Sequence, residues 1–313
     1  MSSLFIIGNG FDLAHNMPTK YSDLRNHIIK TYPESQKCRD RVVYLEDCAE
    51  IYIDDIAAEM LLYVMDHACD NDWNNFEDAL AHINFYKKFP RRIHKENETQ
   101  EEDNMGAEAF LLYIDNLSTV FIKSTACWQA FFRVWINEIK QALESGKYQP
   151  KESLKTLFSE PDSQFFTFNY TKTLQKLYGI KKVIHIHNRV GQKLIFGHGE
   201  KNIFYSEPMV DGSIGSSFLD DMLMSFQKDT VSPFKKYNDF FKRLNTDIDR
   251  VYTFGFSYSR VDSVYIKEII KNISKNATWY FTKHDTLDSK TLGVKKTKLR
   301  RYGFQGEFNV FDA

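Results

Sequence analysis

The chain has 313 residues, of which 42% are hydrophobic and 15% aromatic, so it can form one large α/β domain or two smaller ones around a packed core. Its formal net charge is −1, which excludes the overall basic field typical of proteins that bind nucleic acid. The N-terminal apolar run is too short for a signal peptide, no stretch approaches a membrane span, and the four cysteines form no Cys-x-x-Cys pair. We therefore expect a reduced, cytoplasmic protein that does not enter a membrane.

A short apolar stretch followed by two glycines opens the chain. Residues 4–7 read Leu-Phe-Ile-Ile, which predicts a strand buried on both faces, as in a parallel sheet. Gly8 and Gly10 allow a tight turn and let a phosphate approach the backbone, and a helix that opens there would point free N–H groups at it. Leu13 stands where the G-x-G-x-x-G dinucleotide pattern has its third glycine. The pattern therefore indicates either half of a dinucleotide-binding turn or a tight turn of any α/β protein.

A long helical block follows. Apolar residues recur at steps of three and four from about residue 40 to 68, and again from 108 to about 145. Residues 36–155 lack the strand–helix alternation found on either side of them. We therefore expect a large helical insertion, or lid, over 36–155 within a Rossmann-like, mostly parallel α/β domain formed by 1–35 together with 156–313.

The strand–helix pattern returns in the second half of the chain. It predicts strands at 164–168, 182–187, 194–196, 250–254 and 278–281, with an edge strand at 307–311. Polar residues and glycines follow several of these strands. In an open parallel sheet, ligands bind at the carboxyl ends of the strands, so we expect these groups to meet at one edge. They are Asn169, His187, Gly197–Gly199, which includes His198, and Gly255–Ser257.

Two polar residues at this edge each allow two interpretations. Asp12 falls at the opening of the first helix, where a carboxylate caps the helix or interacts with its dipole. It could instead hold a ribose hydroxyl or orient a water. Asn169 could form an Asx-turn at the end of its strand, or offer its amide to a sugar or carboxamide.

The histidines raise the question of a metal. His185 and His187 are two apart on a predicted strand, so we expect both on one face, where they could form a three-histidine site with His198. No carboxylate or cysteine stands at matching spacing, so we expect no metal. We favour His187, which lies nearer the carboxyl end of its predicted strand, where ligands bind, as a general base or hydrogen-bond donor. A capping box explains Ser259 and Asp262.

Several motifs resemble the AbiH family of bacterial phage abortive-infection proteins. In chain order these motifs are Ile7-Gly8-Asn9-Gly10-Phe11-Asp12-Leu13-Ala14, Pro18-Thr19-Lys20-Tyr21, Trp73-Asn74-Asn75-Phe76-Glu77, Phe166-Thr167-Phe168-Asn169-Tyr170-Thr171, His185-Ile186-His187, Phe196-Gly197-His198-Gly199 and Gly255-Phe256-Ser257. The family usually has glycine after the second histidine, where this chain has Asn188.

The same pattern is similar, more loosely, to SIR2-like proteins with a Rossmann-like sheet. That resemblance implies a nucleotide, NAD, as ligand or substrate, with the glycine turn near its pyrophosphate, Asn169 near the nicotinamide ribose and His187 as the catalytic histidine. The implied nucleotide-binding residues are Gly8, Asn9, Gly10, Phe11, Asn169, Gly197, His198, Gly255, Ser257 and Asp262. Without paired cysteines there is no zinc ribbon, so we do not expect protein deacetylation.

The resemblance thus implies an anti-phage effector that binds and hydrolyses NAD or a related nucleotide. The catalytic candidates are His187, Asn169, Asp12 and Glu77. A buried Glu77 would need a partner, and we expect the helical block to cover the ligand edge and point this carboxylate toward Asp12 and His187.

Two other classes of function stay open. One is a non-catalytic nucleotide-sensing module that acts through a partner protein, and the other is a metal-dependent nuclease that uses the histidines. A phage-derived trigger or a partner defence protein is expected, and nucleic acid is not. The sequence leaves the oligomeric state open.

Overall fold

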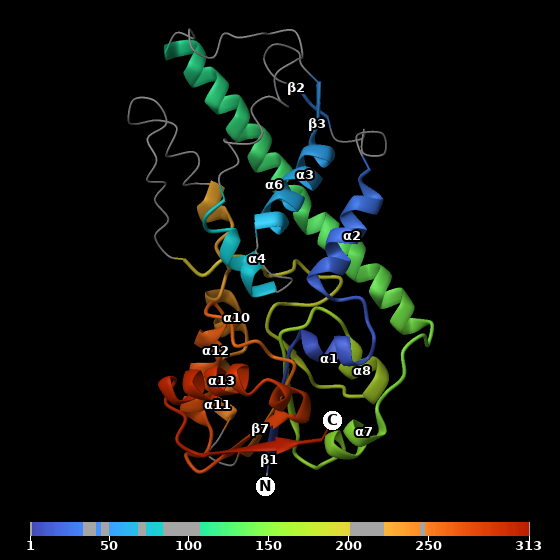
Figure 1. The fold of residues 1–313 in the computed structure, drawn as a ribbon, viewed down its shortest axis with the longest axis vertical. Coiled ribbons are helices and arrows are strands. Elements are labelled where there is room, and N and C mark those ends of the chain that lie inside the picture. Colours follow the sequence, from blue (N-terminus) through green and yellow to red (C-terminus); the bar gives the residue numbers. More distant parts are fainter. Residues whose placement is uncertain are drawn as a thin grey trace. The chain divides into compact units, whose positions relative to one another are not determined.

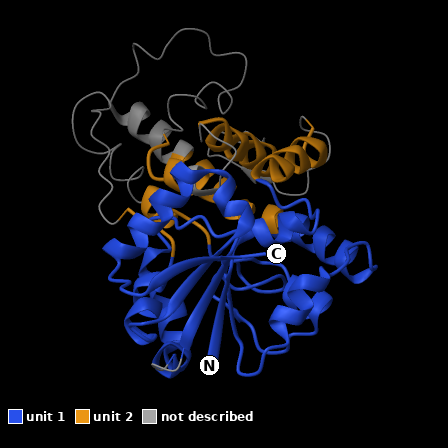
Figure 2. Cartoon of the chain, turned by 60° about the horizontal axis from the view of Figure 1, so that its bottom comes forward, with its two compact units in different colours: residues 1–20, 133–195, 229–313 blue, residues 21–132, 196–228 orange. Residues whose placement is uncertain are grey.

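The computed structural model describes residues 2–33, 42–44, 50–67, 73–83, 107–200, 222–244 and 248–312. The chain forms two compact units, shown in blue and orange in Figure 2. Unit 1 comprises residues 1–20, 133–195 and 229–313, and unit 2 comprises residues 21–132 and 196–228. Residues 196–228 thus belong to the same unit as residues 21–132. The expected insertion at 36–155 does not include residues 196–228.

Unit 1 is built on one six-stranded sheet in which every neighbouring pair of strands is parallel. The strands are β1 (Ser2–Ile7), β4 (Gln164–Thr167), β5 (Ile184–His185), β6 (Ile248–Phe254), β7 (Thr278–Thr282) and β8 (Glu307–Phe311), in the order β5-β4-β1-β6-β7-β8. The chain moves outward from β1 to β5, then returns to the other side of β1 and moves outward to β8. This reversal beside β1 is the topological switch point of a doubly wound fold. The predicted Rossmann-like α/β fold is therefore confirmed.

Short helices connect these strands (Figure 1). They are α1 (Asn9–Ala14), α7 (Glu152–Phe158), α8 (Thr173–Tyr178), α10 (Val231–Lys236), α11 (Asn238–Arg243), α12 (Ser263–Asn272), η3 (Lys283–Leu287) and α13 (Ser289–Arg301). Side chains of α1, α7 and α8 pack in one apolar cluster, and side chains of α11, α12 and α13 pack in a second. Helices thus cover both faces of the sheet.

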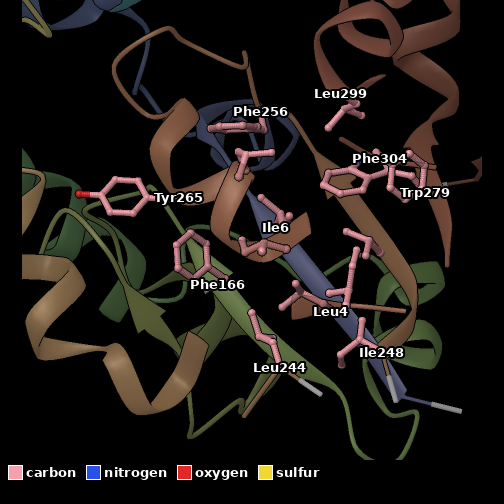
Figure 3. Packing of buried hydrophobic residues seen from close by; sticks show 14 of the residues in the cluster. Leu4, Ile6, Phe166, Leu244, Ile248, Phe256, Tyr265, Trp279, Leu299 and Phe304 are labelled. Carbon is pink, nitrogen blue, oxygen red and sulfur yellow. The ribbon is translucent and has the colours of Figure 1, made fainter. Parts of the chain in front are cut away.

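β1 is buried on both faces, as its four apolar residues predict. Leu4 and Ile6 pack with Phe166 in one cluster (Figure 3), whereas Phe5 and Ile7 pack in the other. Because successive side chains of a strand point to opposite faces, this alternation supplies apolar side chains to both clusters. The strand that precedes the glycine turn is therefore fixed from both sides.

Unit 2 is mainly helical. It contains α2 (Tyr21–Thr31), α3 (Ile53–His67), α4 (Trp73–Ala79) and the first part of α6 (Ala107–Glu144), which confirms the predicted helix at 108–145. The expected helix at 40–68 is wrong in its first part. There β2 (Val42–Tyr44) pairs antiparallel with β3 (Glu50–Tyr52), and α3 begins only at Ile53. Valine, isoleucine and tyrosine in these segments favour strands, and this preference outweighs the apparent helical spacing.

Two other expected strands differ from the structure. β5 spans only two residues of the predicted 182–187, because the chain turns soon after it, with positive φ at Asn188 and Gly191. The predicted strand at 194–196 does not form, and an isolated bridge joins His198 to Gln227 instead.

Two aromatic residues, Phe196 and Phe226, pack against α6 within unit 2. The ring of Phe226 stacks on Trp128 at 5.2 Å, and the ring of Phe196 stacks on Phe132 at 4.5 Å. Trp128 also donates its Nε1 hydrogen to the carbonyl of Ala57 at 2.8 Å, which ties α6 to α3. None of the helices that the structure describes is both long and apolar enough to cross a bilayer.

Candidate functional site

The turn between β1 and α1 meets the loop that follows β6. The N–H of Gly8 donates to the carbonyl of Phe254 at 2.9 Å, and the N–H of Gly10 donates to the carbonyl of Gly255 at 3.0 Å. Within the turn, the N–H of Phe11 donates to the carbonyl of Gly8 at 3.0 Å. Three backbone donors of this turn are therefore already bound to carbonyl groups of the protein.

The glycines permit this contact because they lack side chains. A Cβ on Gly10 would lie 2.5 Å from the Cα of Gly255, and a Cβ on Gly8 would overlap the backbone of Gly255 and Phe256. Gly255 itself has a φ of +60°, in the left-handed region that favours glycine. The three glycines thus allow two loops to pack backbone against backbone, and their contact with a phosphate stays a prediction.

The two residues that flank Gly10 have structural contacts. The side chain of Asn9 donates from Nδ2 to the carbonyl of Thr19 at 2.8 Å, which holds the turn to the segment after α1. The ring of Phe11 is fully buried and packs edge-on against Phe254. Their expected contact with a nucleotide also stays a prediction.

Asp12 is buried among hydroxyl groups and caps no helix. Only 1% of this residue is exposed, and the N-cap of α1 is Gly8, which directly precedes the first helical residue. Oδ2 of Asp12 accepts a hydrogen bond from Thr171 Oγ1 at 2.6 Å, and Oδ1 accepts one from Thr173 Oγ1 at 2.7 Å. Burial raises the pKa of Asp12 from 3.8 to about 6, although hydrogen bonds from Thr171, Thr173 and Asn169 oppose this shift. The carboxyl group thus joins α1 to the loop between β4 and α8.

Asn169 ties the same loop to both neighbouring strands. Its Nδ2 donates to the carbonyl of Gly8 at 3.0 Å, and its own carbonyl accepts from Nδ1 of His185 at 3.0 Å. Nε2 of His185 in turn accepts from the side-chain amide of Gln175 at 2.8 Å. Burial lowers the pKa of His185 to about 4, so this ring is neutral near pH 7. His185 therefore has a structural role, and it helps to position Asn169.

His187 lies beyond the end of β5 and contacts a carboxylate. Its Nε2 is 2.9 Å from Oδ1 of Asp262, the N-cap residue of α12. The other oxygen, Oδ2, accepts a hydrogen bond from Ser259 Oγ at 3.0 Å, and Ser259 Oγ accepts from the N–H of Asp262 at 3.2 Å. The expected pairing of Ser259 with Asp262 thus forms, and Asp262 also reaches a histidine 75 residues away in sequence.

The expectation that His185 and His187 share one face is wrong. His185 meets Gln175 of α8, whereas the ring of His187 lies 5.3 Å from that of Phe168 and 6.3 Å from that of Tyr265. Phe168 and Tyr265 belong to the apolar cluster on the other face of the sheet from α8. β5 ends at His185, so strand alternation no longer decides where His187 points.

Asn188, where the resemblance leads us to expect glycine, has a backbone conformation that favours glycine. Its φ is 62°, in the left-handed region. Asparagine adopts this conformation more readily than most other residues, because its short polar side chain can bond locally. Here its Nδ2 donates to the carbonyl of Lys193 at 2.8 Å.

The contact between His187 and Asp262 suits acid–base chemistry. A carboxylate accepts hydrogen bonds, so Nε2 of the neutral ring carries the proton and Nδ1 carries the basic lone pair. Asp262 fixes this orientation and stabilises the positive charge that forms when Nδ1 takes up a proton. Ser259 donates to the carboxylate and not to the imidazole, so the three groups are not ordered as a serine nucleophile, base and acid.

The remaining candidates on the 196–228 segment and α4 belong to unit 2. Glu77 Oε1 accepts from Lys228 Nζ at 2.7 Å, and the Lys228 side chain is only 1% exposed. The N–H of Lys228 donates to the carbonyl of His198 at 2.9 Å, and Nε2 of His198 donates to the carbonyl of Leu223 at 2.8 Å. The predicted position of Glu77 beside Asp12 and His187 stays a prediction, because those residues lie in unit 1.

The glycine and serine candidates outside the turn also differ in setting. Gly197 has a φ of +143°, and a Cβ there would overlap the carbonyl of Phe226. The absence of a side chain at Gly197 therefore lets the chain before His198 pass close to the backbone of Phe226. Ser257 is exposed on the loop between β6 and α12.

The three histidines meet different partners. Nδ1 of His185 donates to the carbonyl of Asn169, Nε2 of His187 meets Asp262, and His198 belongs to the other unit. Across the residues that the structure describes, no group of three or more His, Cys, Asp and Glu side chains could hold a metal ion.

Sequence reasoning did not find three of the polar residues in these networks. Thr171 and Thr173 hold the Asp12 carboxyl group, and their alternate spacing after a strand end was the signal that could have marked them. Lys228 had no such signal. It lies 151 residues from Glu77, so only the fold brings the two charges together.

Comparison with known proteins places the chain in a family. A family model described as "Bacteriophage abortive infection AbiH" matches residues 4–283, which run from within β1 to the end of β7 and include all of unit 2 and most of unit 1. No curated protein and no solved structure matches the chain, so the likeness to SIR2-like proteins stays an expectation. The family gives the chain a role in phage abortive infection. Because the match covers far more than half of the sequence, the chain belongs to the AbiH family.

Proposed function

We propose that the chain performs its abortive-infection role by binding and hydrolysing NAD or a related nucleotide, with His187 as the general base. The observation that carries this proposal is the buried contact between His187 Nε2 and Asp262 Oδ1, 2.9 Å apart. It lies past the carboxyl end of a strand in a doubly wound parallel sheet, where such folds bind their ligands. The likeness of the His187 motif to SIR2-like proteins adds support by analogy.

The reaction would replace the bond between ribose C1′ and nicotinamide with a bond between C1′ and a water oxygen. The bond between ribose C1′ and the nicotinamide nitrogen breaks, and nicotinamide leaves as a neutral molecule with the electron pair. A water oxygen bonds to C1′, which passes through an oxocarbenium-like state that a preorganised polar site stabilises. His187 takes the proton of that water at Nδ1, and Asp262 stabilises the imidazolium ion that results.

Asp12 and Asn169 would hold the loops of the site in position and would not take part in proton transfer. Asn169 Nδ2 holds the carbonyl of Gly8, and Asp12 holds Thr171 and Thr173, so both fix the β4–α8 loop against the β1–α1 turn. In this proposal they place the strand ends on which the nucleotide lies. Glu77 is proposed as a further acidic group, and normal activity of Glu77→Gln would remove it from the mechanism.

The test is the release of nicotinamide from NAD by purified protein, with and without extract of phage-infected cells. We expect release by the wild type and a loss of about 100-fold or more in His187→Ala, because a general base contributes about that much. His284→Ala changes an exposed histidine of η3 and should keep full activity. No release under any condition would overturn the proposal. Calorimetric binding of NAD that persists in His187→Ala without turnover would favour the nucleotide-sensing module.

A further inference from the structure

We infer that the β1–α1 turn does not bind the pyrophosphate of the nucleotide and that the site recognises its substrate through the nicotinamide–ribose end. The inference rests on the proposed function and specifies which part of the substrate is bound. It comes from three features of the turn: its donors, its free space and its charge.

Two of the first three N–H donors of α1 are already used. In a dinucleotide-binding turn, the first N–H groups of the helix point at the ligand. Here the second and third residues of α1, Gly10 and Phe11, donate to the carbonyls of Gly255 and Gly8, both at 3.0 Å. A phosphate at this place would have to break these hydrogen bonds, and the carbonyl of Gly255 would lose the N–H of Gly10.

The space beside the glycines is also filled. A Cβ on Gly10 would lie 2.5 Å from the Cα of Gly255, so the Gly255 backbone already lies where a side chain, or a ligand atom, would be. The loop that carries Gly255 is held in place further along. The carbonyl of Tyr258 accepts from Lys298 Nζ at 3.0 Å, and the Tyr258 hydroxyl contacts Thr253 and Trp279.

The charge of the turn opposes an anion. Asp12 lies in the first turn of α1, a helix of only six residues. A carboxylate there counteracts the positive end of a helix dipole, which favours anions only when it is not already neutralised. The turn therefore combines occupied donors, a filled surface and a nearby carboxyl group.

The consequence concerns which molecules the enzyme accepts. Nicotinamide mononucleotide and nicotinamide riboside carry the same N-glycosidic bond as NAD but lack the pyrophosphate. If this turn bound the pyrophosphate, both molecules would lose that binding energy in the transition state. Because we infer that it does not, their kcat/KM values should lie close to that of NAD.

The first experiment compares kcat/KM for NAD, the mononucleotide and the riboside with the full chain. We expect the three values to agree within about 30-fold, or about 2 kcal/mol. An advantage of NAD greater than this over both smaller molecules would overturn the inference while leaving the proposed function intact. Hydrolysis of none of the three would overturn the proposed function, and a second measurement would then decide the inference.

The second measurement does not depend on activity. Amide resonances of Gly8, Gly10 and Phe11 are followed by NMR while ADP, which contains the pyrophosphate, is added to the wild-type chain. We expect these resonances, and the slow hydrogen exchange of the Gly10 amide, to stay unchanged at every ADP concentration. A saturable shift of these amides together with faster exchange at Gly10 would overturn the inference.

Discussion

Replacing Asp12 with asparagine should make the protein more stable at neutral and alkaline pH. Asp12 is 1% exposed, and burial raises its pKa from 3.8 to about 6. Since the folded-state pKa lies above the unfolded value, the proton on Asp12 stabilises the fold below about pH 4, and this stabilisation is lost as the pH rises through about 6. A difference of about two pKa units corresponds to about 3 kcal/mol of unfolding free energy.

The variant Asp12→Asn removes the charge but keeps the shape. Its side-chain oxygen can accept a hydrogen bond from one threonine, and its NH2 group can donate to the hydroxyl of the other. We therefore expect about the wild-type stability near pH 4 and a gain of up to about 3 kcal/mol near pH 8. Denaturant unfolding of both proteins at a series of pH values measures this difference directly.

The pH dependence separates this reasoning from a general effect of the substitution. A variant that is less stable than the wild type by a constant amount at all pH values would refute it. That result would mean that the hydrogen bonds from Thr171 and Thr173 offset the effect of burial, so that the pKa of Asp12 is the same in the folded and unfolded states. A gain in stability with a loss of activity would indicate that Asp12 is retained for function at a cost in stability.

Three further substitutions test other contacts. Gly10→Ala should destabilise the protein by about 1–3 kcal/mol, because its Cβ would meet the Gly255 backbone, whereas Gly293→Ala, which has open space, should be neutral or stabilising in thermal unfolding. Lys228→Met should cost about 3–5 kcal/mol in denaturant unfolding, since it removes the cation 2.7 Å from the Glu77 carboxylate, and equal stability would show that the ion pair contributes little. Asp288→Ala should lower stability near pH 7, and this effect should fade as the pH falls through the folded-state pKa of Asp288, because hydrogen bonds from Thr291 lower that pKa. A pH-independent effect would contradict this assignment.

The sequence predicts two elements well: a strand that is buried on both faces and a long helix with a regular apolar periodicity. Residues 4–7 are apolar at every position, so their strand belongs inside a parallel sheet, and the periodicity of residues 108–145 is long enough to specify α6. Short segments are harder, because a few β-branched residues at 42–44 outweigh a helical spacing. The length of β5 depended on where the chain turned, and this also decided the direction of His187.

Contacts over long sequence separations explain the rest of the site. The sequence indicates that Asp262 pairs with Ser259 in a capping box. The two side chains are hydrogen-bonded just before α12, although the Asp262 side chain makes no capping hydrogen bond to that helix. The second contact of Asp262, with His187, follows only from the strand order, which brings β5 and the start of α12 to the same edge of the sheet. The same limit applies to Glu77, for which the sequence predicts the need of a partner but not its identity as Lys228.

The glycine turn shows why a motif alone does not identify a ligand. A pair of glycines after a buried strand indicates that something approaches the backbone closely, because only glycine leaves that space open. The pattern does not say whether the approaching group is a phosphate or another backbone. Here Gly255, nearly 250 residues later, fills the space beside Gly8 and Gly10 and accepts the N–H of Gly10 at 3.0 Å. On the proposed function, the groups to test for nucleotide binding are therefore His187, Asp262 and the strand ends beside them, and not the turn.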